Sequence, residues 1–505
     1  MNRAVARPHK PRPPAATPPE APARAAQVDI PPHPEMAGSV LCLVGLLVTA
    51  VSLHGVTPEA IARYGAFGVL LSIGASLLVD LRRGITNVIR TDVMALMSLY
   101  FLTLAEFLVQ QGQYNAIAGM EPTRTSVLAC IWAYGGLVVG RHLVPPTRKH
   151  PLQKLFQQAV PSSVLFSIFW ACVIIGYLNM MISVQFNLVY MVEYFIQPRF
   201  AQPWQRGRLG DWKAMLYELD MLLYLVPPLG GILIAQRRRH PPVQVFLAAL
   251  AVLFTLFYGF SSGTRNIFAS YLVTFLIGYC FAAGKRQTRE IAMLTVVCGV
   301  ALVASTKVML DFRDVGLEDY IAKGYYKDAS HTQEGQSLAV DNNLYAISRV
   351  TEYFPRHHEF TNFEIPYLAL IHPIPRVFWP GKPEGMSISV EDIFGAEGWT
   401  VATSVVGEEY MMHGDVAVFL MSIFFGACCA WWNLLASPKN SEFGILVYAS
   451  GFFSAVITMR SMNWFSTALL PTLAGLVLGY LLLLRHRERR QAPPAPPRRR
   501  AITPQ

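Results

Sequence analysis

A pair of carboxylates beside a histidine is the part of this sequence best suited to proton transfer. Residues 405–415 read VVGEEYMMHGD, so Glu409 and His413 stand four residues apart. On a continuous helix these two share one face, and Glu408 points roughly 100 degrees away. Such a carboxylate could take a proton from a hydroxyl group, with His413 orienting it or tuning its basicity. The spacing leaves open which glutamate is the base, and a solvated helix end is the alternative interpretation.

A second set of residues is suited to an anion. Arg265 opens an apolar stretch in SSGTRN, where the free amides of a helix start and a guanidinium suit an anion, although an interfacial arginine would look the same. Arg376 and Lys382 flank the turn PRVFWPGKP. Several fixed cations near an apolar surface suit a phosphate or diphosphate attached to a lipid. The expected binding residues are Arg265, Arg376, Lys382, Arg313, Arg349 and Arg460.

The sequence predicts neither a metal ion nor a cofactor. Acidic pairs such as Glu391–Asp392 are direct neighbours, and neighbours on a helix do not converge on one ion. The seven cysteines lie within apolar stretches, without the spacing of a zinc site or a disulfide framework. We therefore expect arginines, in place of a divalent cation, to stabilise a phosphate leaving group.

Apolar stretches must position these residues. The length of each stretch is close to the ~20 residues that a helix needs to span a bilayer. With 53% hydrophobic and only 15% charged residues, the 505-residue chain is predicted to be an all-α polytopic membrane protein. Continuous apolar runs without a period of two argue against a membrane β-barrel. We expect about twelve transmembrane helices, at 36–55, 64–80, 93–111, 126–144, 164–183, 215–236, 242–262, 266–284, 291–308, 414–436, 443–461 and 464–484.

The positive charge is placed where it orients a membrane protein. The net charge is +10, and most lysines and arginines fall in short connectors on one side of a twelve-span map. This distribution predicts that both termini lie in the cytoplasm and that the long connector between helices 9 and 10 lies on the outer face. No basic patch with interleaved aromatic residues occurs elsewhere, so we do not expect a nucleic-acid partner. The first stretch runs from Met36 through Gly55, which is longer than the apolar region of a signal peptide.

The chain is expected to divide into five regions. The proline-rich start and the basic end cannot bury a core, so both are predicted to be disordered. The long connector contains IPYLALIHPIPRVFWPGKPEGMS, in which prolines forbid a continuous helix and predict a re-entrant or surface-lying segment. The regions are a tail at 1–35, helices 1–9 at 36–310, the long loop at 311–413, helices 10–12 at 414–484 and a tail at 485–505.

Three segments resemble the bacterial oligosaccharide repeat-unit polymerases, the Wzy group: GTR at a helix start, HPIPRVFWPGKP in the long connector, and GEEYMMHGD. The likeness extends over the topology of 40–485 and is close only near 261–270, 372–383 and 407–415. In that likeness Arg265, Arg376 and Lys382 match positions suited to diphosphates, and Glu408 or Glu409 matches the glutamate of the family's GE pair.

The resemblance implies a GT-C-like, metal-independent glycosyltransferase in the bacterial inner membrane with its long loop in the periplasm. Its partners would be undecaprenyl-diphosphate-linked glycans and membrane lipid, with flippase and chain-length regulator proteins as further candidates. It would move a growing glycan onto a hydroxyl of another lipid-linked repeat unit. An O-antigen ligase is the nearest alternative. A lipid-linked oligosaccharide flippase or transporter is an alternative of another class, and it would not need so long an outer connector.

Overall fold

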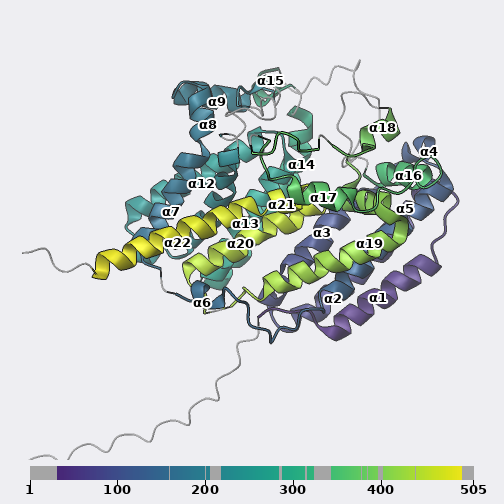
Figure 1. Ribbon diagram of the computed structural model, residues 1–505, viewed down its shortest axis with the longest axis horizontal. Coiled ribbons are helices and arrows are strands. Elements are labelled where there is room, and N and C mark those ends of the chain that lie inside the picture. The colour runs from purple at the N-terminus through teal and green to yellow at the C-terminus, as the bar shows by residue number, and fades with distance from the viewer. Residues whose placement is uncertain are drawn as a thin grey trace, which may run out of the picture.

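The computed structural model describes residues 31–491 apart from 159, 199–200, 205–215, 217, 284–286, 313–314, 324–342, 377, 384, 396–401 and 438. Every regular element in these residues is a helix, which confirms the predicted all-α class (Figure 1). Helices occupy all twelve predicted ranges. Six of the described helices are long and apolar enough to cross a membrane, and these are Pro58–Leu81, Ser162–Ser183, Pro242–Ser261, Arg265–Ala282, Ser404–Asn433 and Trp464–Arg485.

The α-helices, in chain order, are α1 (Met36–Val51), α2 (Pro58–Leu81), α3 (Thr91–Thr103), α4 (Tyr114–Ile117), α5 (Met120–Gly140), α6 (Gln153–Phe156), α7 (Ser162–Gly176), α8 (Leu178–Ser183), α9 (Leu188–Ile196), α11 (Val226–Ala235), α12 (Pro242–Ser261), α13 (Arg265–Ala282), α14 (Thr288–Phe312), α15 (Leu317–Lys323), α16 (Asn343–Tyr353), α17 (Glu364–Ile371), α18 (Val390–Phe394), α19 (Ser404–Asn433), α20 (Glu442–Thr458), α21 (Trp464–Thr467) and α22 (Leu470–Gln491). Short 3-10 helices are η1 (Ile85–Val88), η2 (Ala105–Leu108), η4 (Leu219–Leu225) and η5 (Arg237–Arg239).

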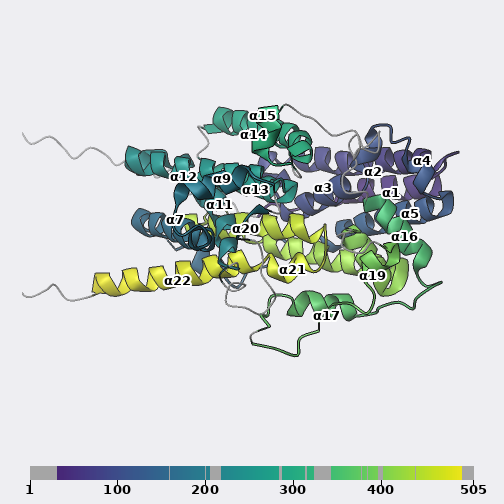
Figure 2. The same cartoon turned by 90° about the horizontal axis from the view of Figure 1, so that it is seen from above.

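Two hydrophobic cores lie side by side in the bundle (Figure 2). The first joins α1, α2, α3, α5, α16 and the main part of α19 around residues such as Leu96 and Val418. The second joins α7, α11, α12, α13 and α20 around residues such as Ile168 and Leu229. α3 and α19 of the first core pack against α20 of the second, so the junction of the two cores is built from these three helices.

The tightest helix pair, α5 with α19, depends on glycine. A Cβ atom at Gly136 would stand 2.6 Å from the carbonyl oxygen of Phe419, and one at Gly426 would stand 2.5 Å from that of Leu137. Both distances are too short for a real side chain, so only glycine lets the two backbones approach this closely. Small residues at helix contacts are typical of packing inside membranes, where apolar side chains gain little by leaving lipid.

The long connector is more helical than the sequence predicted. α15, α16, α17 and α18 lie in it, and α19 begins at Ser404, ten residues before the predicted start of span ten at 414. We call the end of the bundle that carries α16, α17 and α18 the connector end (Figure 1). The opposite end, at which α2 and α5 end and α20 begins, is called the basic end, because Arg83 and Arg141 follow those two helices and Arg239 bonds to Glu442 of α20. α22 continues to Gln491, beyond the boundary predicted at 484. Residues 1–30 and 492–505 of the two predicted disordered tails lie outside the described residues.

Candidate functional site

The residues that follow Thr403 form a helix that turns back on itself. The backbone of α19 leaves helical geometry at His413 and Gly414, and Gly414 has φ +60° and ψ −153°. Glycine alone adopts that conformation readily, because a Cβ would clash with the backbone. The two parts of α19 come together again: the Ser422 hydroxyl donates to Oε2 of Glu409 over 3.3 Å, although the residues are 13 apart in the chain.

The end of the first part of α19 is completed by the connector. The backbone N–H groups of Thr361 and Asn362 donate to the carbonyl oxygens of Met411 and Met412, at 2.9 and 3.1 Å. The Thr361 hydroxyl donates to the same Met411 oxygen at 3.1 Å. These bonds satisfy carbonyls that a broken helix leaves without partners. The connector therefore fixes the position of the first part of α19 and of the glutamates on it.

Glu408 is bound to the turn that follows α20. Its Oε1 accepts a hydrogen bond from the Ser461 hydroxyl at 2.5 Å, and its Oε2 accepts one from the backbone N–H of Met462 at 2.5 Å. A third bond, from Val405 N–H to Met459 O at 3.0 Å, joins the same two segments. The residue between these contacts is Arg460. The carboxylate of Glu408, only 7% exposed, is therefore bonded to the two residues that follow the half-buried Arg460 in the chain.

Glu409 lies deeper and is fully buried. Its Oε2 receives the bond from Ser422, and its Oε1 has no hydrogen-bond partner among the described residues. His413, by contrast, is exposed, and its ring lies 5.3 Å from that of Phe360. The expectation that Glu409 and His413 share a helix face is wrong, because the helix breaks at His413. The alternative of a solvated helix end is wrong as well, because both glutamates are buried.

Two of the predicted cations lie at neighbouring helix ends. Arg265 is the first residue of α13, and Arg460 follows the last turn of α20. The two helices pack against each other and run in opposite directions: Tyr224 contacts Tyr271 near the start of α13 and Phe453 near the end of α20. Arg265 and Arg460 therefore lie at the same end of the bundle as Glu408. Both residues are half-buried.

The other predicted cations have different surroundings. Arg376 donates through its two terminal nitrogens to the carbonyl oxygens of Lys382 and Pro383, at 3.0 and 3.1 Å. Lys382 Nζ donates to the carbonyl oxygens of His372 and Ile374, at 2.9 and 3.0 Å. These two cations hold their own turn together. Arg349 pairs with Glu352 at 2.7 Å on the surface of α16. Arg313 lies outside the described residues.

Sequence reasoning missed a buried ionic cluster at the basic end. Arg90 lies 2.8 Å from an oxygen of Asp80 and 2.9 Å from an oxygen of Asp92. Arg141 lies 3.7 Å from the second oxygen of Asp92, and Asn433 donates to the first at 2.7 Å. None of the four charged residues is more than 2% exposed. The signal in the sequence was that Arg90 stands between two acids, each at the end of an apolar stretch.

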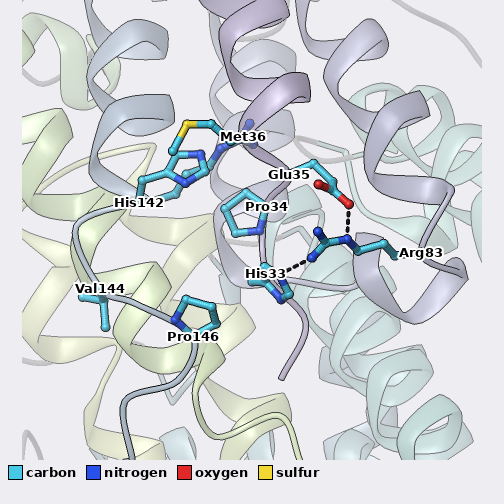
Figure 3. A pocket seen from close by; sticks show the side chains of 9 residues that line it. His33, Pro34, Glu35, Met36, Arg83, His142, Val144 and Pro146 are labelled. Carbon is cyan, nitrogen blue, oxygen red and sulfur yellow. Dashed lines mark hydrogen bonds and ion pairs between the residues drawn. The ribbon is translucent and has the colours of Figure 1, made fainter. Parts of the chain in front are cut away.

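A pocket of about 260 Å³ adjoins this cluster (Figure 3). Glu35 forms an ion pair with Arg83, which also contacts His33. The pocket lies at the basic end, away from the glutamates, and its arginines are balanced by nearby carboxylates. Among the described residues, no three His, Cys, Asp or Glu side chains come together as a metal site. The glutamates with Arg265 and Arg460 thus remain the best candidate site.

Comparison with known proteins gives one match. A family model described as a domain of unknown function (DUF8712) matches residues 343–478. The matched region begins with α16 and ends within α22, so it contains α17, the Arg376–Lys382 turn, both glutamates and Arg460. No curated protein and no solved structure matches the chain.

Proposed function

We propose that this protein is a metal-independent membrane glycosyltransferase with twelve transmembrane helices and a GT-C-like fold, which polymerises lipid-diphosphate-linked oligosaccharide repeat units. The connector end faces the periplasm, and both termini lie in the cytoplasm. One observation carries the proposal: a nearly buried carboxylate, Glu408, is bonded to both residues that follow Arg460. The turn that carries Arg460 is thereby fixed to the part of α19 that carries the proposed proton acceptor.

The chemistry follows from where the reaction takes place. No nucleotide sugars exist outside the cytoplasm, so the energy for polymerisation must arrive as a sugar attached to a lipid diphosphate. Glu408 takes the proton of an acceptor hydroxyl, and the hydroxyl oxygen attacks the anomeric carbon of the donor. The bond from that carbon to the diphosphate oxygen breaks, and the lipid diphosphate leaves with the electron pair. Arg460 and Arg265 stabilise the negative charge that develops on it.

Glu408 fits the role of base better than Glu409. A general base must come within hydrogen-bond reach of the substrate hydroxyl, and Glu408 retains 7% exposure whereas Glu409 retains none. The two donors at Ser461 and Met462 also fix the orientation of Glu408, as catalysis requires. Glu409, beneath it, lies against Ser422 inside the bundle and is assigned a supporting role.

The decisive experiment uses a strain that lacks the protein and is complemented with variants of it. Glu408→Gln should leave the protein in the membrane and yield single repeat units in place of long chains, seen on a glycan gel and by mass analysis of the lipid-linked intermediates. Glu352→Gln, on the surface of α16, is the control and should retain long chains. Long chains made by the Glu408→Gln protein would refute the assignment. Loss of glycan transfer to lipid A core, with polymer length unchanged, would identify a ligase instead.

A further inference from the structure

The connector segment that contains α17 shows a large apolar face to its surroundings. Phe363 is 79% exposed, Tyr367 47%, Leu370 64%, Ile374 40% and Phe378 70%. These positions are three or four residues apart, so over α17 they form one stripe. Exposed apolar stripes of this size on a protein mark a contact with lipid or with another molecule.

The opposite face of α17 is attached to the bundle. Ile365 and Ala369 are buried, the Ser466 hydroxyl donates to the carbonyl oxygen of Ala369, and His372 Nδ1 lies 2.8 Å from the Thr467 hydroxyl. α17 therefore lies along α21 and α19, as both views show (Figures 1 and 2). The helix is thus a fixed part of the bundle that displays its apolar side outward.

The stripe continues an apolar surface that a candidate membrane span already presents. On α19, Val416 is 59% exposed, Leu420 57% and Phe424 47%, at a spacing of four residues. Phe424 contacts Phe465 of α21, the helix to which α17 is attached. Since α19 is long and apolar enough to span a bilayer, the same hydrocarbon that covers its outer face would also reach the α17 stripe.

Among its described residues, the turn after α17 has few backbone polar groups without partners, as a position within the membrane requires. Non-helical backbone at membrane depth is tolerated only where its polar groups are satisfied inside the protein. Four prolines between 372 and 383 lack an N–H group, which removes four donors. Lys382 supplies donors to two carbonyl oxygens of the turn, and Arg376 supplies donors to two more. The two cations are therefore directed at the backbone of their own turn.

We infer that Phe363–Pro383 is a re-entrant segment whose apolar face is covered by the acyl chains of the membrane, with Arg376 and Lys382 satisfying the carbonyls of its proline-rich turn. The inference goes beyond glycosyl transfer and does not depend on it. It gives the two cations a positioning role at the level of the lipid headgroups. It also fixes how deep the connector lies in the membrane. Because Thr361 and Asn362 of the connector bond to the first part of α19, that part of α19 is held at a matching depth.

Nitroxide accessibility in the full-length protein tests the inference. The protein, with its seven cysteines replaced, is reconstituted into phospholipid nanodiscs and labelled at single cysteines placed at Tyr367, Leu370 or Phe378. Labels in hydrocarbon collide more with oxygen than with a water-soluble nickel chelate. A label at Leu71 of α2, 71% exposed on a candidate span, is the lipid reference, and one at Asp392 of α18 is the aqueous reference.

We expect the three α17-segment labels to give oxygen-to-nickel ratios like that at Leu71. Ratios like that at Asp392 would overturn the inference. Labels that neither reagent reaches would show burial against protein, and this would also overturn it.

A second set of variants tests the role of the cations. Lys382→Met removes the donors to His372 and Ile374 and keeps the length of the side chain. In this variant the label at Phe378 should become several-fold more accessible to the nickel chelate, because the turn moves toward water to satisfy its carbonyls. Arg349→Met, on the surface of α16, is the control and should leave the label unchanged. An unchanged ratio in Lys382→Met would exclude the proposed role. None of these readings depends on polysaccharide synthesis, so they stand even if Glu408→Gln makes normal polymer.

Discussion

Glu408 and Glu409 are neighbours in the chain, yet their carboxylates enter different parts of the protein. Glu408 is bonded to Ser461 and Met462 in the turn after α20, whereas Glu409 contacts Ser422 in the second part of α19. The first contact joins α19 to the turn that carries Arg460, and the second joins the two parts of α19 to each other. The two glutamates should therefore respond differently to the same substitution.

Ser461 provides a test that leaves both glutamates in place. Ser461→Ala removes one hydrogen bond to Glu408, so the carboxylate loses part of its fixed orientation. Misplacement of a reacting group lowers a rate by up to about 100-fold, and we expect shorter glycan chains and accumulated repeat units. Ser461→Thr keeps a hydroxyl and should retain most of the chain length. Glycan gels of the two strains, at matched membrane levels, make the comparison. Equal chain lengths in the two variants would mean that Ser461 does not position the base.

The buried ionic cluster should be far more sensitive than ion pairs on the surface. Asp92→Asn leaves Arg90 and Arg141 facing a neutral side chain inside the bundle, and removing one partner of a buried ion pair costs about 3–5 kcal/mol. Glu290→Gln breaks an ion pair with Arg237 in which each side chain is 41% exposed. This substitution should change the free energy of unfolding little. Thermal unfolding of the two variants in detergent measures the difference. Similar midpoints would mean that the cluster contributes no net stability.

Hydropathy predicted where the helices lie, and six of the described helices are long and apolar enough to cross a membrane. It could not predict the depth of charged residues. Arg90 lies in a short connector of the kind whose cations were predicted to set orientation, yet it is buried with Asp80 and Asp92 as its ion-pair partners. Local sequence cannot reveal that pairing, since it depends on how α2 and α3 are placed by the rest of the bundle.

The candidate site was predicted by residue type and only partly by geometry. Spacing assumes an unbroken helix, so it placed His413 beside Glu409. Gly414 was the available warning, because a glycine next to polar residues often marks a change of direction. The partners Ser461 and Met462 are more than 50 residues away in sequence, and no local pattern could have identified them.

The glycine contact between α5 and α19 should fail when a side chain is added. Gly426→Leu would push a side chain into the carbonyl oxygen of Leu137, and overpacking of this kind costs about 1–3 kcal/mol or more. Gly74→Leu is the matched control, because a Cβ there meets nothing within 4 Å. We expect a lower yield of folded protein for Gly426→Leu alone, measured by size-exclusion chromatography of detergent extracts. Equal yields would show that α5 and α19 can separate without loss of the fold.

His150 should make the protein less stable as the pH falls. It lies in the connector after α5, is 3% exposed and contacts Trp431, and burial lowers its pKa from 6.5 to about 4. Its Nδ1 accepts a hydrogen bond from the backbone N–H of Leu152, so a proton there would face another donor. The folded protein thus holds the neutral ring while the unfolded chain binds a proton near pH 6.5.

The sign of the pH effect follows from that difference. The unfolded state binds more protons than the folded state between about pH 6.5 and 4, so the stability that His150 contributes is complete above 6.5 and is lost as the pH falls through that interval. The glutamine in His150→Gln does not titrate. Lowering the pH from 7.5 to 5 should therefore lower the unfolding midpoint of the wild type relative to that of the variant. His54→Gln, at an exposed site near the connector end, is the control and should follow the wild type. A constant gap across this range would mean that His150 is not held neutral.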